Sequence, residues 1–325
     1  MTANAAERLL QHYVDNFRRL PWRAAPGEAP PNPYRVWLSE VMLQQTTVAT
    51  VIPRFKRFVQ RWPTIAALAA ARDEDILSEW AGLGYYARAH NLIACAHEVA
   101  TRGAFPQTSA ELKELPGLGE YTAAAIAAIA FGAHVAVVDT NVARVVARLH
   151  ALTSPTKAKL EQLALAMTPA DRPGDFAQAM MDLGATLCRP TAPRCEQCPL
   201  NMTCAAYACG HPEAFPARKT KTVRPQRYGT AYWTERDGQV WLVRRPAKGL
   251  LGGMAALPGE EWTGSRTAGP ALGTVSHTFT HFSLELRIER RVDPVGEGWW
   301  QSIEQLDTAG LPTLYRRAVD VALAA

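Results

Sequence analysis

One carboxylate, Glu40, lies inside an apolar segment near the N-terminus of this 325-residue chain. The segment, residues 36–47, reads VWLSEVMLQQTT, and at helical spacing Glu40, Gln44 and Thr47 share one narrow polar face. Burial raises the pKa of a carboxyl group, and an acid that is still protonated near neutral pH can act as a general acid. The ordinary alternative is a surface or salt-bridged glutamate on a helix.

A second carboxylate, Asp139, ends an apolar run and precedes a predicted helix that carries Arg144 and Arg148. Aspartate is favoured as a helix N-cap, where it stays ionised. A fixed negative charge also stabilises a developing cation. One protonated and one ionised carboxyl group are the pair that cleaves glycosidic bonds through oxocarbenium-like transition states. Glu40 and Asp139 are therefore candidates for such a pair, while a purely capping role for Asp139 stays open.

Four cysteines follow the spacing Cys-x6-Cys-x2-Cys-x5-Cys. They are Cys188, Cys195, Cys198 and Cys204. Four thiolates this close in sequence suit a metal centre, and both tetrahedral zinc and a [4Fe–4S] cluster accept such a set. The spacing does not distinguish the two, but a chance group of core cysteines is improbable.

Two glycine-containing segments are candidates for nucleic-acid contacts. In residues 115–119, LPGLG, Gly117 and Gly119 let the amides at the start of the following helix approach a phosphate oxygen, as in a helix-hairpin-helix. In the segment GLGYYAR, Tyr85 could wedge between bases while Arg88 contacts the DNA backbone. A turn without a ligand and tyrosines packed under a loop are the structural alternatives.

The elements around these motifs predict two kinds of architecture. Helical patterns, beginning with an amphipathic helix over 7–20, dominate to about residue 187 and predict a mainly α N-terminal part. From Tyr228 onward, alternating strands, a turn at 237–238 and a helix near 313–323 predict an α+β part. Residues 211–227 hold three prolines and five Lys or Arg against one Glu, which predicts an exposed basic linker.

The composition, 48% hydrophobic and 20% charged, is typical of a globular protein. A formal net charge of +5 and a pI near 8.9 make nucleic acid a plausible partner. The first residues show no export signal, and the longest apolar run is too short to span a membrane. We therefore expect a cytoplasmic protein, nucleoid-associated through DNA, without membrane contacts and with cysteines that are reduced or metal-bound.

Taken together, these residues resemble the helix-hairpin-helix iron–sulfur DNA glycosylases and, within them, the adenine DNA glycosylases (MutY type), which excise adenine paired with 8-oxoguanine. The resemblance is most specific at residues 21–23 (PWR), 33–46 (PYRVWLSEVMLQQT) and 82–88, in the hairpin and in the four-cysteine loop. It implies a helix-hairpin-helix glycosylase region over 1–210. Its six-helix barrel would span about 25–130, with a cluster domain from 1–24 plus 131–210. The linker 211–227 and a smaller α+β Nudix-like 8-oxoguanine recognition domain, 228–325, would follow.

The same resemblance implies roles for individual residues. Glu40 would protonate the adenine ring and then assist water, while Asp139 would stabilise the sugar cation or its covalent adduct. Tyr121 stands where endonuclease III-type relatives carry a Schiff-base lysine, which implies a glycosylase without efficient strand cleavage. One [4Fe–4S] cluster, rather than zinc, is implied for the four cysteines. Further residues implied are Gln45 and Tyr85, inserted into the duplex beside 8-oxoguanine, and Trp22, Arg23, Gln178 and Asp182, lining the adenine pocket.

The C-terminal part resembles the recognition domain of that family. Residues 250–254 and 258–259 match its strand and turn, and Phe279-Thr280-His281 matches the Phe-Ser-His loop that contacts 8-oxoguanine. The metal-binding Nudix helix does not follow residues 259–262, so we expect no pyrophosphohydrolase activity. Two other departures are Thr140, where adenine glycosylases commonly have Gly, and a longer Pro-rich loop at 24–33.

The sequence thus predicts a monomeric, monofunctional adenine DNA glycosylase of base excision repair. It would hydrolyse the N-glycosidic bond of adenine mispaired with 8-oxoguanine or G in double-stranded DNA, after base flipping. One alternative is an endonuclease III-like glycosylase/AP lyase for oxidised pyrimidines, which Thr140 favours but Tyr121 and the C-terminal part oppose. Another is a non-enzymatic lesion-binding protein, which the presence of both Glu40 and Asp139 opposes.

Overall fold

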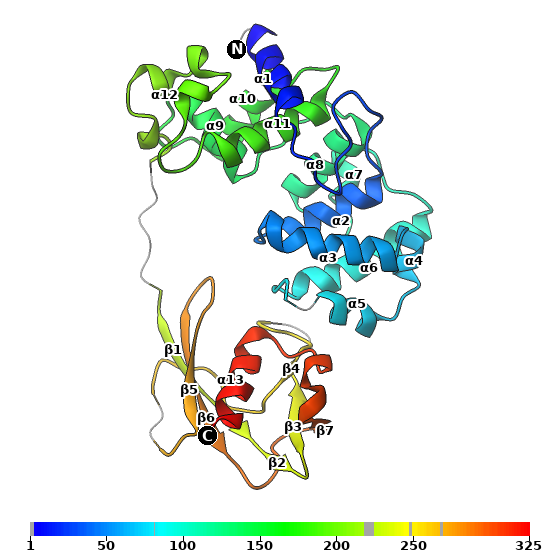
Figure 1. Cartoon of the computed structure of the whole chain (residues 1–325), viewed down its shortest axis with the longest axis vertical. Coiled ribbons are helices and arrows are strands. Elements are labelled where there is room, and N and C mark those ends of the chain that lie inside the picture. Colours follow the sequence, from blue (N-terminus) through cyan, green and yellow to red (C-terminus); the bar gives the residue numbers. More distant parts are fainter. Residues whose placement is uncertain (1–2, 81, 218–223, 247–248, 267–268) are drawn as a thin grey trace. The chain divides into compact units, whose positions relative to one another are not determined.

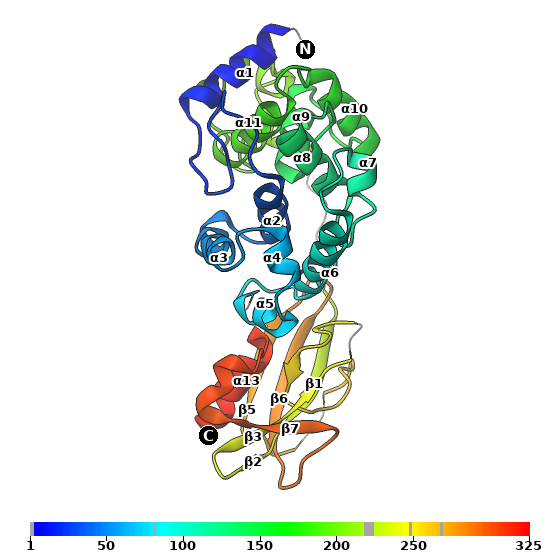
Figure 2. The same ribbon diagram turned by 90° about the vertical axis from the view of Figure 1, so that its right-hand side faces the viewer.

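The computed structural model describes residues 3–80, 82–217, 224–246, 249–266 and 269–325. The chain divides into two compact units (Figures 1 and 2). The first unit comprises Met1–Ala71 and Asn91–Thr220, and the second comprises Arg72–His90 and Lys221–Ala325. In the described part of the chain every strand follows Arg224, which confirms a mainly α N-terminal part and an α+β C-terminal part.

The N-terminal part is built from helices joined by short loops. The α-helices are α1 Ala3–Asp15, α2 Pro33–Leu43, α3 Val48–Arg61, α4 Ile65–Ala69, α5 Asp73–Trp80, α6 Ala87–Arg102, α7 Ser109–Leu112, α8 Glu120–Phe131, α9 Thr140–Leu149, α10 Lys157–Met167, α11 Pro173–Thr186 and α12 Ala205–Ala208. Short 3-10 helices are η1 Cys195–Gln197, η2 Asn201–Thr203 and η3 Pro212–Ala214. Residues 212–217, at the start of the predicted linker, therefore have defined structure, whereas 218–223 lie outside the described residues.

The segment 36–47 is not one helix, so the predicted polar face is wrong beyond Glu40. Helix α2 ends at Leu43 because Gln44 has ψ 113° and Gln45 has φ 56°, neither of which continues a helix. Thr47 instead caps α3 and accepts a hydrogen bond from the amide of Thr50. Glu40 is the member of the three that remains inside α2.

Helix α1 ends at Asp15 rather than continuing to residue 20. The guanidinium of Arg18, in the segment after the helix, forms an ion pair with Asp182 of α11 at 3.1 Å. The amphipathic pattern of residues 7–20 thus predicts more helix than forms, and the residues after Asp15 instead make contacts with distant parts of the unit. Helix α1 also shares a hydrophobic core with α9 and α11, in which Leu9, Val146 and Met180 are fully buried.

Helix α8 lies at the centre of the first unit, and its alanines explain how its neighbours come so close. Its residues from Thr122 to Ala130 are buried, and α2, α7 and α11 all pack against it. At Gly174, in the first turn of α11, a Cβ atom would lie 2.6 Å from the carbonyl oxygen of Ala128. Small residues therefore allow the backbones of α8 and α11 to approach each other closely.

The C-terminal part contains two small sheets and a helix. Its elements are β1 Gln226–Trp233, β2 Glu235–Arg236, β3 Gln239–Arg244, β4 Ala255–Ala256, β5 Gly273–Thr278, β6 Ser283–Arg290, β7 Gly298–Ser302, η4 Ile303–Thr308 and α13 Thr313–Leu323. One sheet has the order β1-β6-β5, with β1 parallel to β6 and β5 antiparallel to it. The other has the order β2-β3-β4, and β7 also pairs with β3.

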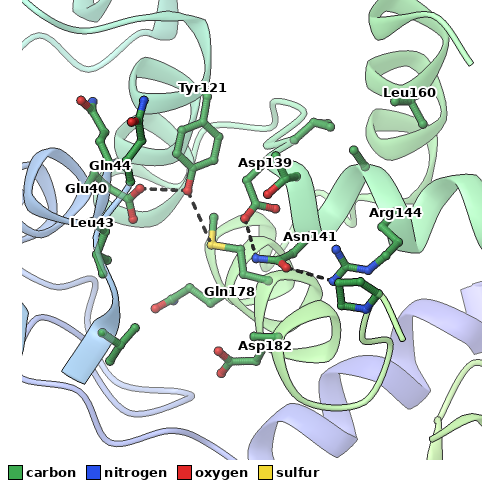
Figure 3. Close-up of a pocket in the computed structure, with 18 of the residues that line it drawn as sticks. Glu40, Leu43, Gln44, Tyr121, Asp139, Asn141, Arg144, Leu160, Gln178 and Asp182 are labelled. Atoms are coloured by element: carbon green, nitrogen blue, oxygen red, sulfur yellow. Dashed lines mark hydrogen bonds between the residues drawn. The ribbon is translucent and has the colours of Figure 1, made fainter. Parts of the chain in front are cut away.

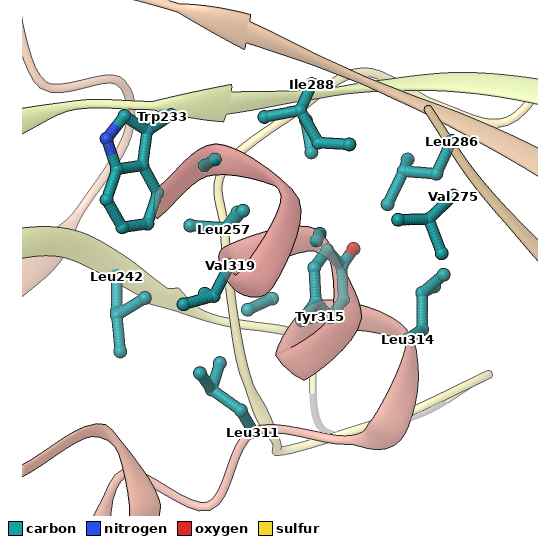
Figure 4. Packing of buried hydrophobic residues seen from close by; sticks show 14 of the residues in the cluster. Trp233, Leu242, Leu257, Val275, Leu286, Ile288, Leu311, Leu314, Tyr315 and Val319 are labelled. Carbon is teal, nitrogen blue, oxygen red and sulfur yellow. The ribbon is translucent and has the colours of Figure 1, made fainter. Parts of the chain in front are cut away.

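The predicted turn and final helix of this part are confirmed, and one predicted strand is wrong. Asp237 and Gly238 both have positive φ, as a two-residue hairpin turn requires, and α13 spans Thr313–Leu323. Residues 250–254 form turns, because Leu251 and Gly253 also have positive φ; the strand is the short β4 that follows. Figure 4 shows Trp233, Leu286 and Tyr315 among the buried side chains that pack α13 against the strands.

A transmembrane segment is missing from the described residues, since none of their helices combines the length and the apolar character that crossing a bilayer would need.

Replacing Gly174 by alanine should destabilise the protein by about 1–3 kcal/mol, because the new Cβ would overlap the backbone of α8. A glycine-to-alanine change in a helix ordinarily stabilises, so the expected sign is the reverse of the usual one. The urea midpoint of unfolding measures the effect. Gly264→Ala, at a position with open space around the added Cβ, is the matched control. An unchanged or raised midpoint for Gly174→Ala would contradict the close helix contact.

Candidate functional site

A cavity of about 1260 Å³ in the first unit brings the two predicted carboxylates together (Figure 3). It is lined by α2, α8, α9, α11 and the loop before α2. The predicted site residues on its wall are Trp22, Arg23, Glu40, Gln45, Tyr121, Asp139, Gln178 and Asp182. Residues that are up to about 160 positions apart in sequence thus share one cavity, which is larger than most small-molecule pockets.

Glu40 is buried, with 7% of its surface exposed, and faces this cavity from α2. Burial raises the pKa of its carboxyl group from the ordinary 4.5 to about 7. The hydrogen bond from Tyr121 and the charge of Arg23 act in the opposite direction, and the charge of Asp139 adds to the rise. The carboxyl group is therefore substantially protonated near neutral pH, as a general acid must be.

The hydroxyl group of Tyr121, in the first turn of α8, donates a hydrogen bond to Glu40 Oε2 at 2.9 Å. Burial raises the pKa of Tyr121 well above its ordinary value, so the phenol stays protonated and keeps this donor role. The phenol lacks an amine, so it has no means of forming a Schiff base with an opened sugar. Its position fixes one oxygen of Glu40 and leaves the other for a ligand.

Asp139 caps α9, as its sequence position predicts. Its Oδ1 accepts a hydrogen bond from the amide of Val142 at 2.7 Å, and its Oδ2 accepts one from Asn141 Nδ2 at 2.9 Å. Both oxygens are thereby held at the positive end of the helix dipole. This carboxyl group therefore has a fixed place on the cavity wall, set by two donors, whereas Glu40 is desolvated.

Asn141 is a site residue that the sequence reasoning missed. Its amide orients Asp139, and its Oδ1 accepts a hydrogen bond from Arg144 at 3.0 Å (Figure 3). The guanidinium of Arg144 also binds the carbonyl oxygens of Gly184 and Cys188, at 2.7 and 2.8 Å. The sequence signal was an asparagine two positions after the aspartate, on the helix that the aspartate caps.

The four residues predicted for the base pocket line the cavity, but one of them is already engaged. Asp182 binds Arg23 through two hydrogen bonds, at 2.6 and 3.0 Å, and binds Arg18 at 3.1 Å. Trp22 is buried against Phe55, with ring centroids 5.2 Å apart. Asp182 therefore positions Arg23 rather than offering a free carboxylate. The sequence did not identify Arg18, because it reads as an ordinary charge on an amphipathic helix.

Gln45 and Tyr85, expected to insert into DNA, both sit in tight turns and point into solvent. Their φ angles are 56° and 48°, in the left-handed region, and both side chains are exposed. Positive φ in a non-glycine residue is often associated with function. Gln45 belongs to the first unit and Tyr85 to the second.

Arg88 does not occupy the exposed position expected of a phosphate contact. Its guanidinium is buried and donates to the carbonyl oxygens of Leu83 and Gly84, at 2.9 and 3.2 Å. Burial lowers its pKa to about 10. It also lies over the rings of Trp80 and Tyr85. Arg88 thus supports the turn that presents Tyr85.

The predicted hairpin joins α7 to α8. Gly117 needs to be glycine for two reasons, because its φ is 76° and because a Cβ atom would lie 2.6 Å from Cβ of Asn91. Gly119 is the N-cap of α8, with open space where a Cβ would be. The first amides of α8 are therefore approachable by an anion.

The four predicted metal ligands lie in the loop between α11 and α12. Cys188, Cys198 and Cys204 pack against the core of the first unit, and burial raises the pKa of Cys198 to about 11. The charges of the other three thiols add to that rise, so the four lie near one another. Among the described residues, however, no three His, Cys, Asp or Glu side chains are arranged as metal ligands. Four thiols in one loop are donors that suit a metal cluster, although the described side chains do not converge on one point.

The predicted recognition loop, residues 279–281, connects β5 to β6. Phe279 is half-buried, whereas Thr280 and His281 are exposed at the tip. The described residues after 259, up to 266, form no helix.

Family models match both parts of the chain. The model for the HhH-GPD superfamily base excision DNA repair protein matches residues 38–169, and the NUDIX domain model matches residues 229–321. The chain is also similar to solved glycosylases. The structure of a thermostable thymine-DNA glycosylase has a TM-score of 0.57 and 27% identity, covering 63% of this chain and 95% of that one. A trapped endonuclease III–DNA intermediate, with a TM-score of 0.54 and 24% identity over the same shares, has the same helical fold.

Curated relatives extend the match to nearly the whole chain. The adenine DNA glycosylase of Homo sapiens is 34% identical over 96% of this chain and 73% of its own length. That of Mycolicibacterium smegmatis is 41% identical over 68% of this chain and 73% of its own. The enzyme of Arabidopsis thaliana is 36% identical over 86% of this chain and 51% of its own. With two carboxylates in one cavity of a helix-hairpin-helix fold and a Nudix-like domain later in the sequence, this chain belongs to the adenine DNA glycosylases, the DNA N-glycosylases that remove adenine in base excision repair.

Proposed function

We propose that this protein hydrolyses the N-glycosidic bond of adenine opposite 8-oxoguanine or G in double-stranded DNA, and that it acts as a monomer. The observation that carries the proposal is the buried carboxyl group of Glu40, whose pKa is raised to about 7 in a cavity that also holds Asp139. Its protonation state at neutral pH is that of an acid able to protonate a leaving base.

In the proposed reaction, adenine is flipped out of the duplex into the cavity, because the glycosidic bond is out of reach inside the stack. Glu40 transfers its proton to the adenine ring, the C–N bond breaks with its electron pair moving to the base, and a cationic sugar remains. Asp139, held by Val142 and Asn141, stabilises that cation electrostatically. Water then adds to the sugar and gives up a proton to the ionised Glu40, which restores the acid.

Tyr121 and the Nudix-like domain support this proposal over the endonuclease III-like alternative. Tyr121 fills the position where a lyase needs an amine, and its hydroxyl group holds Glu40. The recognition loop 279–281 would read 8-oxoguanine through the exposed side chains of Thr280 and His281. Gln45 and Tyr85 would enter the duplex, and the amides after Gly117 and Gly119 would bind a phosphate.

Single-turnover excision on a panel of duplexes tests the proposed substrate. We expect adenine to be removed fastest opposite 8-oxoguanine, more slowly opposite G and slowest opposite T. We also expect no release of an oxidised pyrimidine and no efficient covalent trapping by borohydride. Rapid excision of the pyrimidine together with efficient trapping would favour the glycosylase/lyase instead.

The pKa of Glu40 gives a pH dependence. Because the acid form is the active one, the rate of the chemical step should fall as pH rises through about 7. Glu40→Gln should lower the single-turnover rate by roughly 10²- to 10⁴-fold, the usual contribution of general acid catalysis. A flat profile from acid to mildly alkaline pH, or near-wild-type excision by Glu40→Gln, would contradict the assignment.

The same pKa should appear in stability, which provides a control independent of catalysis. A carboxyl group whose pKa is higher in the folded than in the unfolded state destabilises the fold as pH rises from about 4.5 to about 7. Glu40→Gln keeps an acceptor for Tyr121 without this penalty. It should be more stable than the wild type above pH 7, by at most about 3 kcal/mol, and no more stable at pH 4. Thermal melts at the two pH values measure the difference.

We further propose that Cys188, Cys195, Cys198 and Cys204 hold one [4Fe–4S] cluster. Such a cluster supplies a covalent cross-link that orders the loop between α11 and α12. Arg148 supports this loop from α9, donating to Cys188 Sγ at 3.4 Å and to the carbonyl oxygen of Arg189 at 2.7 Å. The four thiolates accept either metal, and the family resemblance supports iron over zinc.

Purified protein should contain about four iron atoms per chain and show the broad visible absorbance of a cluster, which zinc with its filled d shell lacks. Cys198→Ser should lower both the iron content and the melting temperature. Cys209→Ser, at an exposed cysteine outside the four-cysteine pattern, is the matched control. Colourless protein with bound zinc would refute the cluster.

A further inference from the structure

A tryptophan that no motif singled out, Trp262, stacks on the recognition loop. Its ring and that of Phe279 have centroids 5.5 Å apart and planes inclined by 25°. The ring centroid of Phe282, on the far side of the loop, lies 6.1 Å from that of Trp262. Trp262 thus forms one wall of a small aromatic cluster at the base of the loop.

The backbone around Trp262 is held against strand β1. Thr263 and Tyr228 exchange two backbone hydrogen bonds of 2.8 Å each, and the amide of Glu260 donates to the carbonyl oxygen of Thr230. The guanidinium of Arg245 lies 4.9 Å from the ring centroid of Trp262, a cation–π contact. The segment that carries Trp262 therefore runs along the edge of the sheet as an added strand-like piece.

Space for the indole is made by a glycine. A Cβ atom at Gly229, in β1, would lie only 2.3 Å from Cδ1 of Trp262. The φ of Gly229 is not in the left-handed region, so glycine is needed there for room and not for backbone conformation. The missing side chain of Gly229 thus leaves the space that the indole of Trp262 occupies.

Phe279 is in turn the residue that fixes the loop. Its amide donates to the carbonyl oxygen of Phe282 at 2.9 Å, and its ring also contacts those of Phe282 and His277, at 4.9 and 4.6 Å. Thr280, the next residue, is exposed. Because the ring of Phe279 is packed on three sides, it fixes where the exposed Thr280 begins to project from the sheet.

We infer that Trp262 is a positioning residue for the recognition of 8-oxoguanine. It acts through Phe279, and Gly229 leaves the space for its indole. The inference rests on the proposed function, in which residues 279–281 contact the lesion. The described residues 260–266 form no helix, and Trp262 within them packs against Phe279 of the loop. In this role Trp262 acts through its contact with Phe279 and not through a contact of its own with the lesion.

The test is the preference for adenine opposite 8-oxoguanine over adenine opposite G, measured as the ratio of single-turnover rates at subsaturating enzyme. Trp262→Ala should lower this ratio roughly two- to tenfold, which is the size of effect that one aromatic pair supplies. Gly229→Ala, which displaces the indole without removing it, should lower the ratio in the same direction. Trp262→Phe, which keeps a stacking ring, should restore most of it.

Two further variants separate the inference from the proposed function. Gly264→Ala, two residues from Trp262 in open space, should keep the wild-type ratio. His281→Ala tests the loop itself: if it leaves the ratio unchanged, reading by residues 279–281 is refuted. If His281→Ala lowers the ratio but Trp262→Ala and Gly229→Ala do not, the proposed function stands and the role of Trp262 is refuted. If Trp262→Ala lowers the excision rates on both duplexes by the same factor, Trp262 has only a structural role and the inference is also overturned.

Discussion

The burial of one carboxyl group, Glu40, is the constraint on which the catalytic unit depends. An ionised carboxylate is unfavourable in such surroundings, so the group is kept protonated near neutral pH instead of being paired with a cation. The hydroxyl group of Tyr121 satisfies one oxygen without supplying a positive charge. Arg23 lies near enough to influence the pKa, yet its guanidinium is bound by Asp182. Because Asp182 binds Arg23, the positive charge of Arg23 lowers the pKa of Glu40 less than a free guanidinium would.

The helix packing serves this arrangement. The four side chains come from different elements: Glu40 from α2, Tyr121 from α8, Asp182 from α11, and Asp139 from the N-cap of α9. Helix α8 packs against both α2 and α11, and its alanines allow close contact. Asp139, by contrast, caps α9 and accepts two hydrogen bonds. Two carboxyl groups in one cavity therefore have different surroundings, because one is desolvated and the other is bound by backbone and amide donors.

In the Nudix-like domain, packing likewise determines which residues are exposed for binding. The sheet retains its β1-β6-β5 order, while the segment after Pro258 runs along β1 without forming a helix. A domain that lacks its metal-binding motif can keep the fold and present a loop for binding only. Aromatic stacking at the base of residues 279–281 gives that loop a defined direction.

The sequence by itself determined the mainly α and α+β parts, the hairpin glycines, the turn at Asp237-Gly238, the N-cap at Asp139 and the family, because each depends on local spacing or on a contiguous motif. It misplaced the end of α1 and the continuation of α2, and it missed Arg18, Asn141 and Trp262. Arg18 and Trp262 depend on partners distant in the chain, Asp182 and Phe279. Asn141 binds near neighbours, but its role shows only where Asp139 faces the cavity. Only the tertiary structure decided that Glu40 is desolvated and Arg88 turned inward, because burial is a property of what surrounds a residue and not of its neighbours in sequence.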